Sequence, residues 1–171
     1  MLKSKQYSIN RQALRLTFLL TSLLFAEFCS AQLEESQSAR LPQIYINTTV
    51  NLSPIKKVLA TIRIESEHHN PFESFCGIEY HGNSTLESAK KSFDFELRTE
   101  SGEDSTQRIL DFAPDEDFVL ISNTFDHTHL RNVFATMLWS EMGHYTPQYI
   151  HCEVYLNDEY QGLYLLIEKI K

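Results

Sequence analysis

A small polar loop followed by two lysines contains the residue types in this chain that could do chemistry. The loop is His81-Gly82-Asn83-Ser84-Thr85, and Lys90-Lys91 stand at the start of the next predicted strand. Backbone N–H groups and hydroxyls of such a loop can surround phosphate oxygens, and a strand lysine can supply the point charge that polyphosphate requires. The pattern predicts a nucleotide-phosphate site, with an ordinary turn and solvated lysines as the structural alternative.

A second phrase lies further along the chain, where Asp126, Thr128, Leu130, Arg131 and Asn132 follow one another closely. Asp and Thr are preferred at helix starts because their side-chain oxygens accept hydrogen bonds from free backbone N–H groups. We favour this structural interpretation, in which Asp126 or Thr128 caps a helix and Arg131 ties that helix to the sheet.

The third phrase is Glu168-Lys169-Ile170, which follows a predicted β-hairpin. Kinases pair a strand lysine with a glutamate to orient phosphate, so Glu168 is a candidate partner for Lys91. A solvated Glu-Lys pair is the structural alternative, and the two interpretations stay open.

Together these phrases resemble the first half of a CotH-type kinase domain, the spore-coat protein kinase family, over residues 41–171. That family carries an Arg-Gly-Asn-Ser-Ser phrase, and here His81 stands at the Arg position and Thr85 at the last Ser. The family's Lys-Lys-Ser-Tyr phrase appears as Lys90-Lys91-Ser92-Phe93. Because His lacks the permanent charge and fork of Arg, we expect a weaker hold on phosphate or on an acidic partner at residue 81.

The resemblance implies ATP-dependent phosphorylation of Ser or Thr on a secreted or surface protein, with ATP and Mg²⁺ as cofactors. The implied nucleotide-binding residues are His81, Gly82, Asn83, Ser84, Lys90, Lys91 and Glu168.

The aspartates that hold the metal in that family are expected after the Glu-Lys-Ile phrase, so we assign no catalytic residue and no metal ligand. We expect a truncated kinase that is inactive alone and exposes an apolar face for its missing C-terminal half. The alternative is a non-catalytic secreted binding or structural module of a coat or adhesion type.

The N-terminus has the features of a bacterial signal peptide over residues 1–31. A basic lead precedes an apolar run at residues 14–28, and small residues precede Gln32. We expect cleavage after Ala31, a flexible lead over residues 32–40, a partial CotH-kinase-like domain over residues 41–171, and a secreted or extracytoplasmic product without a stable membrane span. An uncleaved N-terminal anchor is the alternative.

The charge balance argues against polyanionic partners. Residues 1–31 hold four basic residues and one acidic residue, so the rest of the chain keeps 11 basic and 22 acidic residues, a net charge of −11. Such a surface repels nucleic acid and anionic lipid.

Two cysteines, Cys76 and Cys152, follow the predicted cleavage point, and they fit either a disulfide or two buried thiols. Neither belongs to a C-x-x-C pair, and the histidines lack ligand spacing, so no zinc site is predicted.

Alternating apolar residues predict strands at residues 44–46, 57–65, 75–80, 92–97 and 118–121, and a hairpin over residues 151–167 that turns at Asn157-Asp158. One main amphipathic helix is predicted over residues 127–142. The fold class is α+β with a mainly antiparallel sheet, resembling the nucleotide-side half of an atypical protein-kinase-like fold. The helix should pack a core stripe of Leu130, Val133, Phe134, Met137, Leu138 and Met142.

Overall fold

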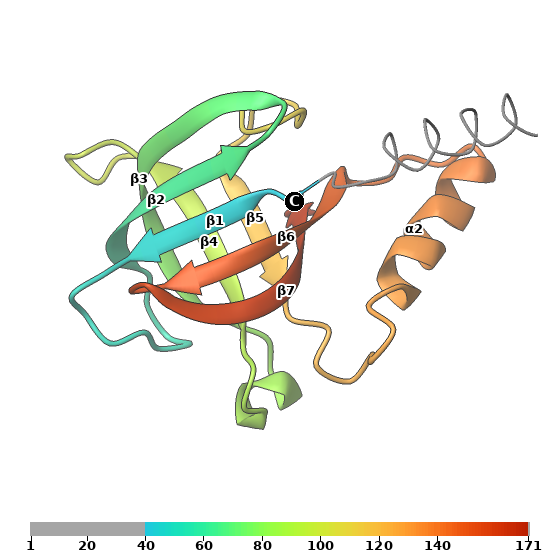
Figure 1. Cartoon of the computed structure of the whole chain (residues 1–171), viewed down its shortest axis with the longest axis horizontal. Helices are drawn as coiled ribbons and strands as arrows, with labels where there is room; N and C mark the ends of the chain where they lie inside the picture. The colour runs from blue at the N-terminus through green and yellow to red at the C-terminus, as the bar shows by residue number, and fades with distance from the viewer. Residues whose placement is uncertain (1–39, 171) are drawn as a thin grey trace, which may run out of the picture. The chain divides into compact units, whose positions relative to one another are not determined.

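The computed structural model describes residues 40–170, in which seven strands form a closed barrel (Figure 1). The predicted signal peptide and almost all of the predicted lead lie outside the described residues. The strands are β1 (Gln43–Asn47), β2 (Val58–Ser66), β3 (His69–His81), β4 (Ser92–Arg98), β5 (Asp117–Ile121), β6 (Tyr149–Leu156) and β7 (Glu159–Glu168). A 3-10 turn, η1 (Ser84–Glu87), follows β3, and the helix α2 (Arg131–Glu141) connects β5 to β6.

The barrel closes through one parallel pair of strands. Its order is β1-β2-β3-β4-β5-β7-β6, and β6 then pairs with β1 in parallel, whereas all other neighbours are antiparallel. Tyr45 on β1 and Tyr155 on β6 are register partners at this seam, and their rings stack at 4.7 Å. Closure leaves none of the seven strands with an unpaired edge.

The core fills the inside of the barrel because each strand turns alternate side chains inward. Phe95 on β4 and Phe118 on β5 stack at 5.4 Å, and both are fully buried. The other large side chains in this core are Ile44, Ile46, Ile62, Ile64, Ile78, Phe93, Leu97, Ile109, Phe112, Leu120, Tyr164 and Leu166.

The predicted hairpin is confirmed. Asn157 and Asp158 connect β6 to β7 with φ angles of 49° and 64°, the left-handed geometry of a tight turn. Gly162 lies where the strand register shifts, and its φ of 99° disfavours a side chain. The glycine therefore marks a bulge.

The α+β prediction is only partly confirmed. The fold is mainly β, a mixed seven-stranded barrel with one short helix, and it shows no distinct kinase-lobe arrangement among residues 40–170. Strand alternation predicts which side chains share a face, but it does not show that β1 pairs with a strand about 110 residues away.

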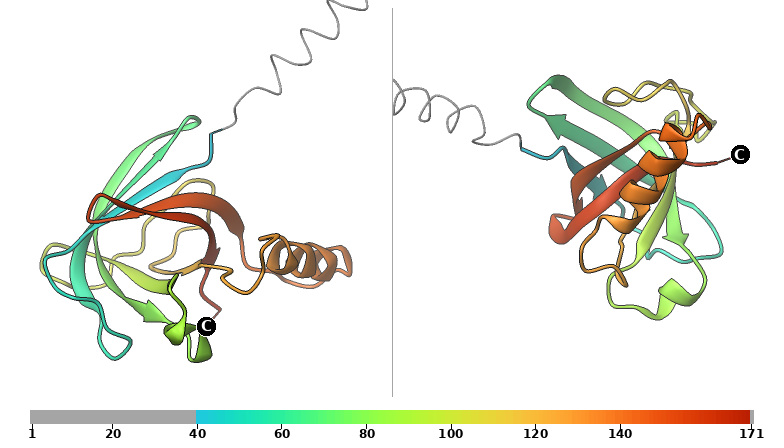
Figure 2. Two further views of the ribbon diagram at one scale, coloured as in Figure 1. Left: turned by 60° about the horizontal axis from the view of Figure 1, so that its bottom comes forward. Right: turned by 90° about the vertical axis from the view of Figure 1, so that its right-hand side faces the viewer.

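The helix prediction is too long and its packing is wrong. Residues 126–130 form turns, with His129 at a φ of 57°, so α2 begins at Arg131. Phe134 is 60% exposed and Met142 is 61% exposed, and the barrel core is already filled by strand side chains. Figure 2 shows α2 projecting from the barrel. Trp139, the single Trp of the chain, is half exposed on this helix and stacks on His144 at 3.8 Å.

No helix among the described residues is long and apolar enough to cross a membrane.

The two cysteines of the barrel are free thiols. Cys76 on β3 and Cys152 on β6 are completely buried, and burial raises the pKa of each thiol to about 12. Both therefore stay protonated at neutral pH.

We expect neither buried thiol to react with a disulfide reagent in the native protein at about pH 8. The measurement is thiol titration of a Cys29→Ser chain, which removes the cysteine outside the described residues. Both Cys76 and Cys152 should react once guanidinium unfolds the barrel. Rapid native reaction of either one, or no thiol after unfolding, would contradict the free, buried state.

Candidate functional site

Two of the chemical phrases meet at a pocket of about 250 Å³ on the outside of the barrel. Thr85 comes from the polar loop, Ser92 from the start of β4, and Asp126 from the segment after β5. Arg131 and Asn132 come from the start of α2. The remaining lining residues are Ile121, Ser122, Asn123, Thr124 and Phe125.

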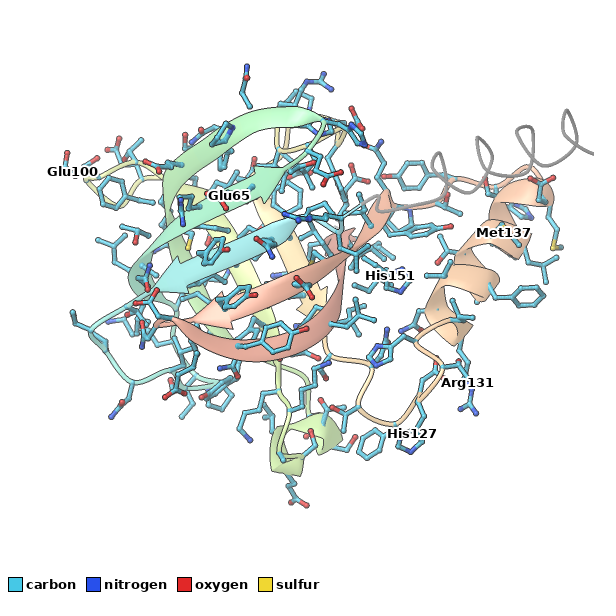
Figure 3. The ribbon with its side chains drawn as sticks, in the orientation of Figure 1. Glu65, Glu100, His127, Arg131, Met137 and His151 are labelled. Carbon is cyan, nitrogen blue, oxygen red and sulfur yellow. The ribbon has the colours of Figure 1, made fainter. Side chains whose placement is uncertain are left out.

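Asp126 organises the chain before α2. One carboxylate oxygen accepts a hydrogen bond from the Thr128 hydroxyl at 2.6 Å, and the other accepts one from the Arg131 backbone N–H at 2.9 Å. These two bonds lower the pKa of Asp126. The N-cap residue is Leu130, which makes no side-chain cap bond, so the predicted cap at Asp126 or Thr128 is wrong in position, and Asp126 instead holds the first N–H of α2 from the preceding turn. Arg131 lies at the start of α2 (Figure 3), and its exposed guanidinium is 3.7 Å from Asp126 rather than tying the helix to the sheet.

The pocket wall is rich in neutral hydrogen-bonding groups. Ser122 donates its N–H to the Ser92 hydroxyl at 3.0 Å, and the Thr124 hydroxyl lies 3.0 Å from that of Ser122. Asn123 adopts a left-handed φ of 49° and accepts a hydrogen bond from the Asn132 amide at 2.7 Å. The side-chain nitrogen of Asn123 is buried without a hydrogen-bond partner, which is costly unless an acceptor reaches it.

A buried carboxylate lies two residues from the pocket on the same face of β4. Asp94 is 3% exposed and lies 2.6 Å from the Lys169 ammonium and 2.9 Å from the Lys57 ammonium. His81 Nδ1 is 3.7 Å away. The first and third phrases, through His81 and Lys169, therefore meet at Asp94.

The same network continues along β4 to Glu96. Lys57 lies 3.1 Å and Arg98 2.9 Å from the Glu96 carboxylate. Gly77 on β3 leaves room for this, because a Cβ there would lie 2.7 Å from Arg98 Cζ. Burial opposes ionisation of Glu96, but the hydrogen bonds from Lys57 and Arg98 outweigh it and lower its pKa to about 2.

The two lysines predicted to face phosphate bind backbone carbonyls. Lys90 donates to the Leu163 carbonyl at 2.5 Å and lies 4.4 Å from the centre of the Tyr164 ring, and burial lowers its pKa. Lys91 donates to the carbonyls of Leu86 at 2.5 Å and Ser88 at 3.2 Å. Neither lysine lines the pocket, so their phosphate role stays a prediction.

Glu168 is not brought together with Lys91. Its carboxylate accepts hydrogen bonds from the Gln148 N–H at 2.8 Å and the Tyr145 hydroxyl at 3.5 Å. Glu168 pairs with Phe118 on β5, and Phe118 pairs with Phe95 on β4. Phe95 is four residues from Lys91, which corresponds to about 13 Å along the strand direction.

The loop that contains Gly82, Asn83 and Ser84 is exposed, and Thr85 is the member of this phrase that reaches the pocket. Gly82 has a φ of 117°, and a Cβ there would lie 2.0 Å from the Thr85 hydroxyl. Glycine is therefore required to place Thr85.

The described residues of the pocket do not fit Mg²⁺. Asp126 is the single carboxylate that lines it, and its oxygens already accept hydrogen bonds from the Thr128 hydroxyl and the Arg131 N–H. Among residues 40–170, one acidic triplet, Asp115-Glu116-Asp117, brings its carboxylates within 4.8 Å. It lies at the other end of β5, and Asp115 there accepts hydrogen bonds from the next two backbone N–H groups.

Sequence patterns did not reveal Asp94, Lys57 or Asn123 as members of this site. Asp94 alternates with the buried Phe93 and Phe95, so alternation assigns it to the outward face of β4 and does not indicate that it is buried. Asp94 is buried because Lys57 and Lys169, from segments far away in the chain, cover the outer face of β4. Local alternation does not indicate such distant contacts.

A family model described as CotH kinase protein matches residues 78–171, which is part of the typical domain. No curated protein matches the chain.

The low pKa of Glu96 predicts that protonation of this carboxylate contributes to unfolding in acid. Because its pKa is about 2 in the folded chain and 4.5 ordinarily, the stabilisation is complete above pH 4.5 and is lost as the pH falls toward 2. We expect Glu96→Gln to lower the free energy of unfolding by about 1–3 kcal/mol at neutral pH, and the difference to shrink in acid.

Denaturant unfolding at several pH values measures this effect. Glu100→Gln, at an exposed position just after β4, is the matched control and should leave the pH profile unchanged. A pH-independent difference between the native chain and Glu96→Gln would contradict the ionic role of Glu96.

Proposed function

Because the chain belongs to the CotH kinase family, we propose that its barrel is the nucleotide-side part of a secreted, ATP-dependent kinase of Ser or Thr residues. Kinase family membership implies a nucleotide cofactor in general terms. The observation that carries the finer proposal is the buried, unpartnered Asn123 amide nitrogen in the wall of the pocket.

The pocket suits phosphate oxygens better than any other part of a nucleotide. Its wall supplies the Thr85 hydroxyl and the Asn123 amide, whereas the Ser92 hydroxyl already donates to Ser122, and Arg131 adds an exposed cation at the helix start. The Asp126 carboxylate already binds the first N–H of α2, so the helix dipole adds little for a second anion and the proposal rests on the side chains. A phosphate group there would accept the hydrogen bond that Asn123 lacks.

The Asp94 cluster would support the same ligand. Asp94 holds Lys57 and Lys169 about 7 Å along β4 from Ser92, the spacing of two residues in a strand. A carboxylate that fixes an ammonium group reduces the entropy that the lysine would lose on binding phosphate. We propose that Lys169 takes the role that the sequence suggested for Lys91, and that the loop at residues 81–84 closes over the phosphates.

Phosphoryl transfer also requires Mg²⁺ and a base, and the described residues of this pocket do not fit the metal. We propose that these groups come from the part of the CotH domain beyond the matched residues. The exposed apolar side chains of α2, including Phe134 and Leu138, are a suitable surface for that part to cover. Residues 40–170 alone would then bind nucleotide without catalysing transfer.

We expect the chain to bind ATP, and to do so in the presence of EDTA because the proposed contacts involve no metal. Asn123→Asp keeps the side-chain shape but replaces the donor with a negative charge, so it should weaken binding at least tenfold. Arg131→Met should weaken it roughly threefold to tenfold. Isothermal titration calorimetry measures both effects.

Arg40→Met is the matched control, since Arg40 is an exposed arginine outside the pocket. It should bind ATP like the native chain. No ATP binding with or without Mg²⁺, or equal binding by Asn123→Asp, would overturn the nucleotide role, and the non-catalytic module would then be the better interpretation.

The apolar surface of α2 gives a separate prediction. Replacing both Phe134 and Leu138 by Ser should halve the fluorescence of a bound hydrophobic dye, roughly in proportion to the apolar surface removed. Thermal unfolding followed by far-ultraviolet circular dichroism should stay within about 2 °C of the native chain, because these side chains are exposed. Leu166→Ser, in the barrel core, is the destabilising comparison, and a similar loss from the double variant would contradict exposure of the helix.

A further inference from the structure

Two adjoining hollows of about 430 Å³ each lie on the outer face of β1, β2 and β3, away from the proposed nucleotide pocket. They share Asn47, Thr61 and Phe75 and so form one continuous groove. Figure 3 labels Glu65, which lies on the same outward face of β2 as the groove residues Thr61 and Arg63.

The groove combines an apolar floor with a neutral polar rim. Phe75 and Leu59 form the floor, and Leu59 is 47% exposed. Asn47, Thr61 and Asn157 bring amides and a hydroxyl to the rim. Asn157 accepts a hydrogen bond from the Thr48 backbone N–H at 2.8 Å through its oxygen, which orients the amide nitrogen as a remaining donor.

The charges of the groove are few and balanced. Arg63 and Glu73 line the second hollow, and Arg63 is already paired with Glu65 at 2.5 Å and placed over the Tyr45 ring at 4.6 Å. A polyanion or a polycation therefore gains little here. A peptide cannot add a strand beside the groove either, because the barrel has no open edge in β1, β2 or β3.

The groove suits an uncharged ligand that has both an apolar C–H face and many hydroxyls. A sugar ring has this chemistry. The C–H bonds of a pyranose pack on an aromatic face, whose electron density is negative, and its hydroxyls pair with amides and threonines. Hollows of 430 Å³ each have the size of small-ligand sites and would hold successive sugar units. A protein partner needs a larger apolar core than Phe75 and Leu59 supply.

We propose that this groove binds a neutral oligosaccharide, with Phe75 as the stacking platform and Asn47 and Asn157 as hydrogen-bonding groups. Almost all of the groove, from Asn47 to Phe75, lies outside residues 78–171, so this site is a property of the present chain beyond the matched part of the kinase domain. It does not depend on nucleotide binding.

The test is calorimetric titration of the full chain with three neutral probes: cellohexaose, chitohexaose of N-acetylglucosamine, and maltoheptaose. At least one should bind, with little dependence on salt. Phe75→Ala should weaken that binding about tenfold or more, and Asn47→Ala about fivefold. Asn47 is exposed at the end of β1, so its variant tests the groove if Phe75→Ala fails to fold.

Tyr160→Ala is the matched control, because Tyr160 is an exposed aromatic residue on the outer face of the barrel that lines neither hollow. It should bind the same oligosaccharide normally. Failure of all three probes, unchanged binding by Phe75→Ala and Asn47→Ala, or capture of proteins in place of the probes would overturn the proposal. ATP should neither compete with the sugar nor be affected by Phe75→Ala, so this result is independent of the nucleotide titration.

Discussion

The parallel pairing of β1 with β6 is the constraint on which the rest of the molecule depends. It joins segments about 110 residues apart, so its loop-closure entropy is high and the pairing requires strong local contacts. Tyr155 stacks on Tyr45 at 4.7 Å, Tyr160 lies tilted against Tyr155 at 5.2 Å, and Arg63 lies over the Tyr45 ring at 4.6 Å. This ladder crosses four strands and the seam itself. Without the pairing of β1 with β6, the barrel would be an open sheet, and β1, which lines the groove, would lose one of its two neighbours.

Charge burial on β4 holds distant segments of the chain together in a second way. Lys57 precedes β2, and Lys169 follows β7, yet both ammonium groups reach Asp94 on β4. Desolvating three charges is costly, and the cost is offset only because each cation lies at contact distance from a carboxylate. Two lysines therefore lie beside the pocket, and in the wall of that pocket the Asn123 amide nitrogen has no hydrogen-bond acceptor. The cluster and the pocket are therefore best regarded as one region of the outer face of β4.

Much of the local structure could be predicted from the sequence, because alternation and turn residues act over a few residues. The strand at residues 92–97 and the turn at Asn157-Asp158 are examples. Barrel closure could not be predicted, since periodicity gives the face of a strand but not its distant partner. For the same reason the apolar stripe of α2 was assigned to a core that the strands already fill. The lysine pair shows a third limit: residue type indicated phosphate, whereas Lys90 and Lys91 reach backbone carbonyls at the end of the barrel.

The position of Trp139 has an optical consequence. The chain has a single Trp, and it lies half exposed on α2, stacked on His144, while the barrel contains only Tyr and Phe rings. Emission from the indole therefore reports the helix and its surroundings, and unfolding of the barrel is seen separately through tyrosine absorbance. Indole fluorescence and tyrosine absorbance thus give separate signals for the helix and for the barrel. Any body that covers α2 would be visible as a blue shift of the indole without a change in the tyrosine signal.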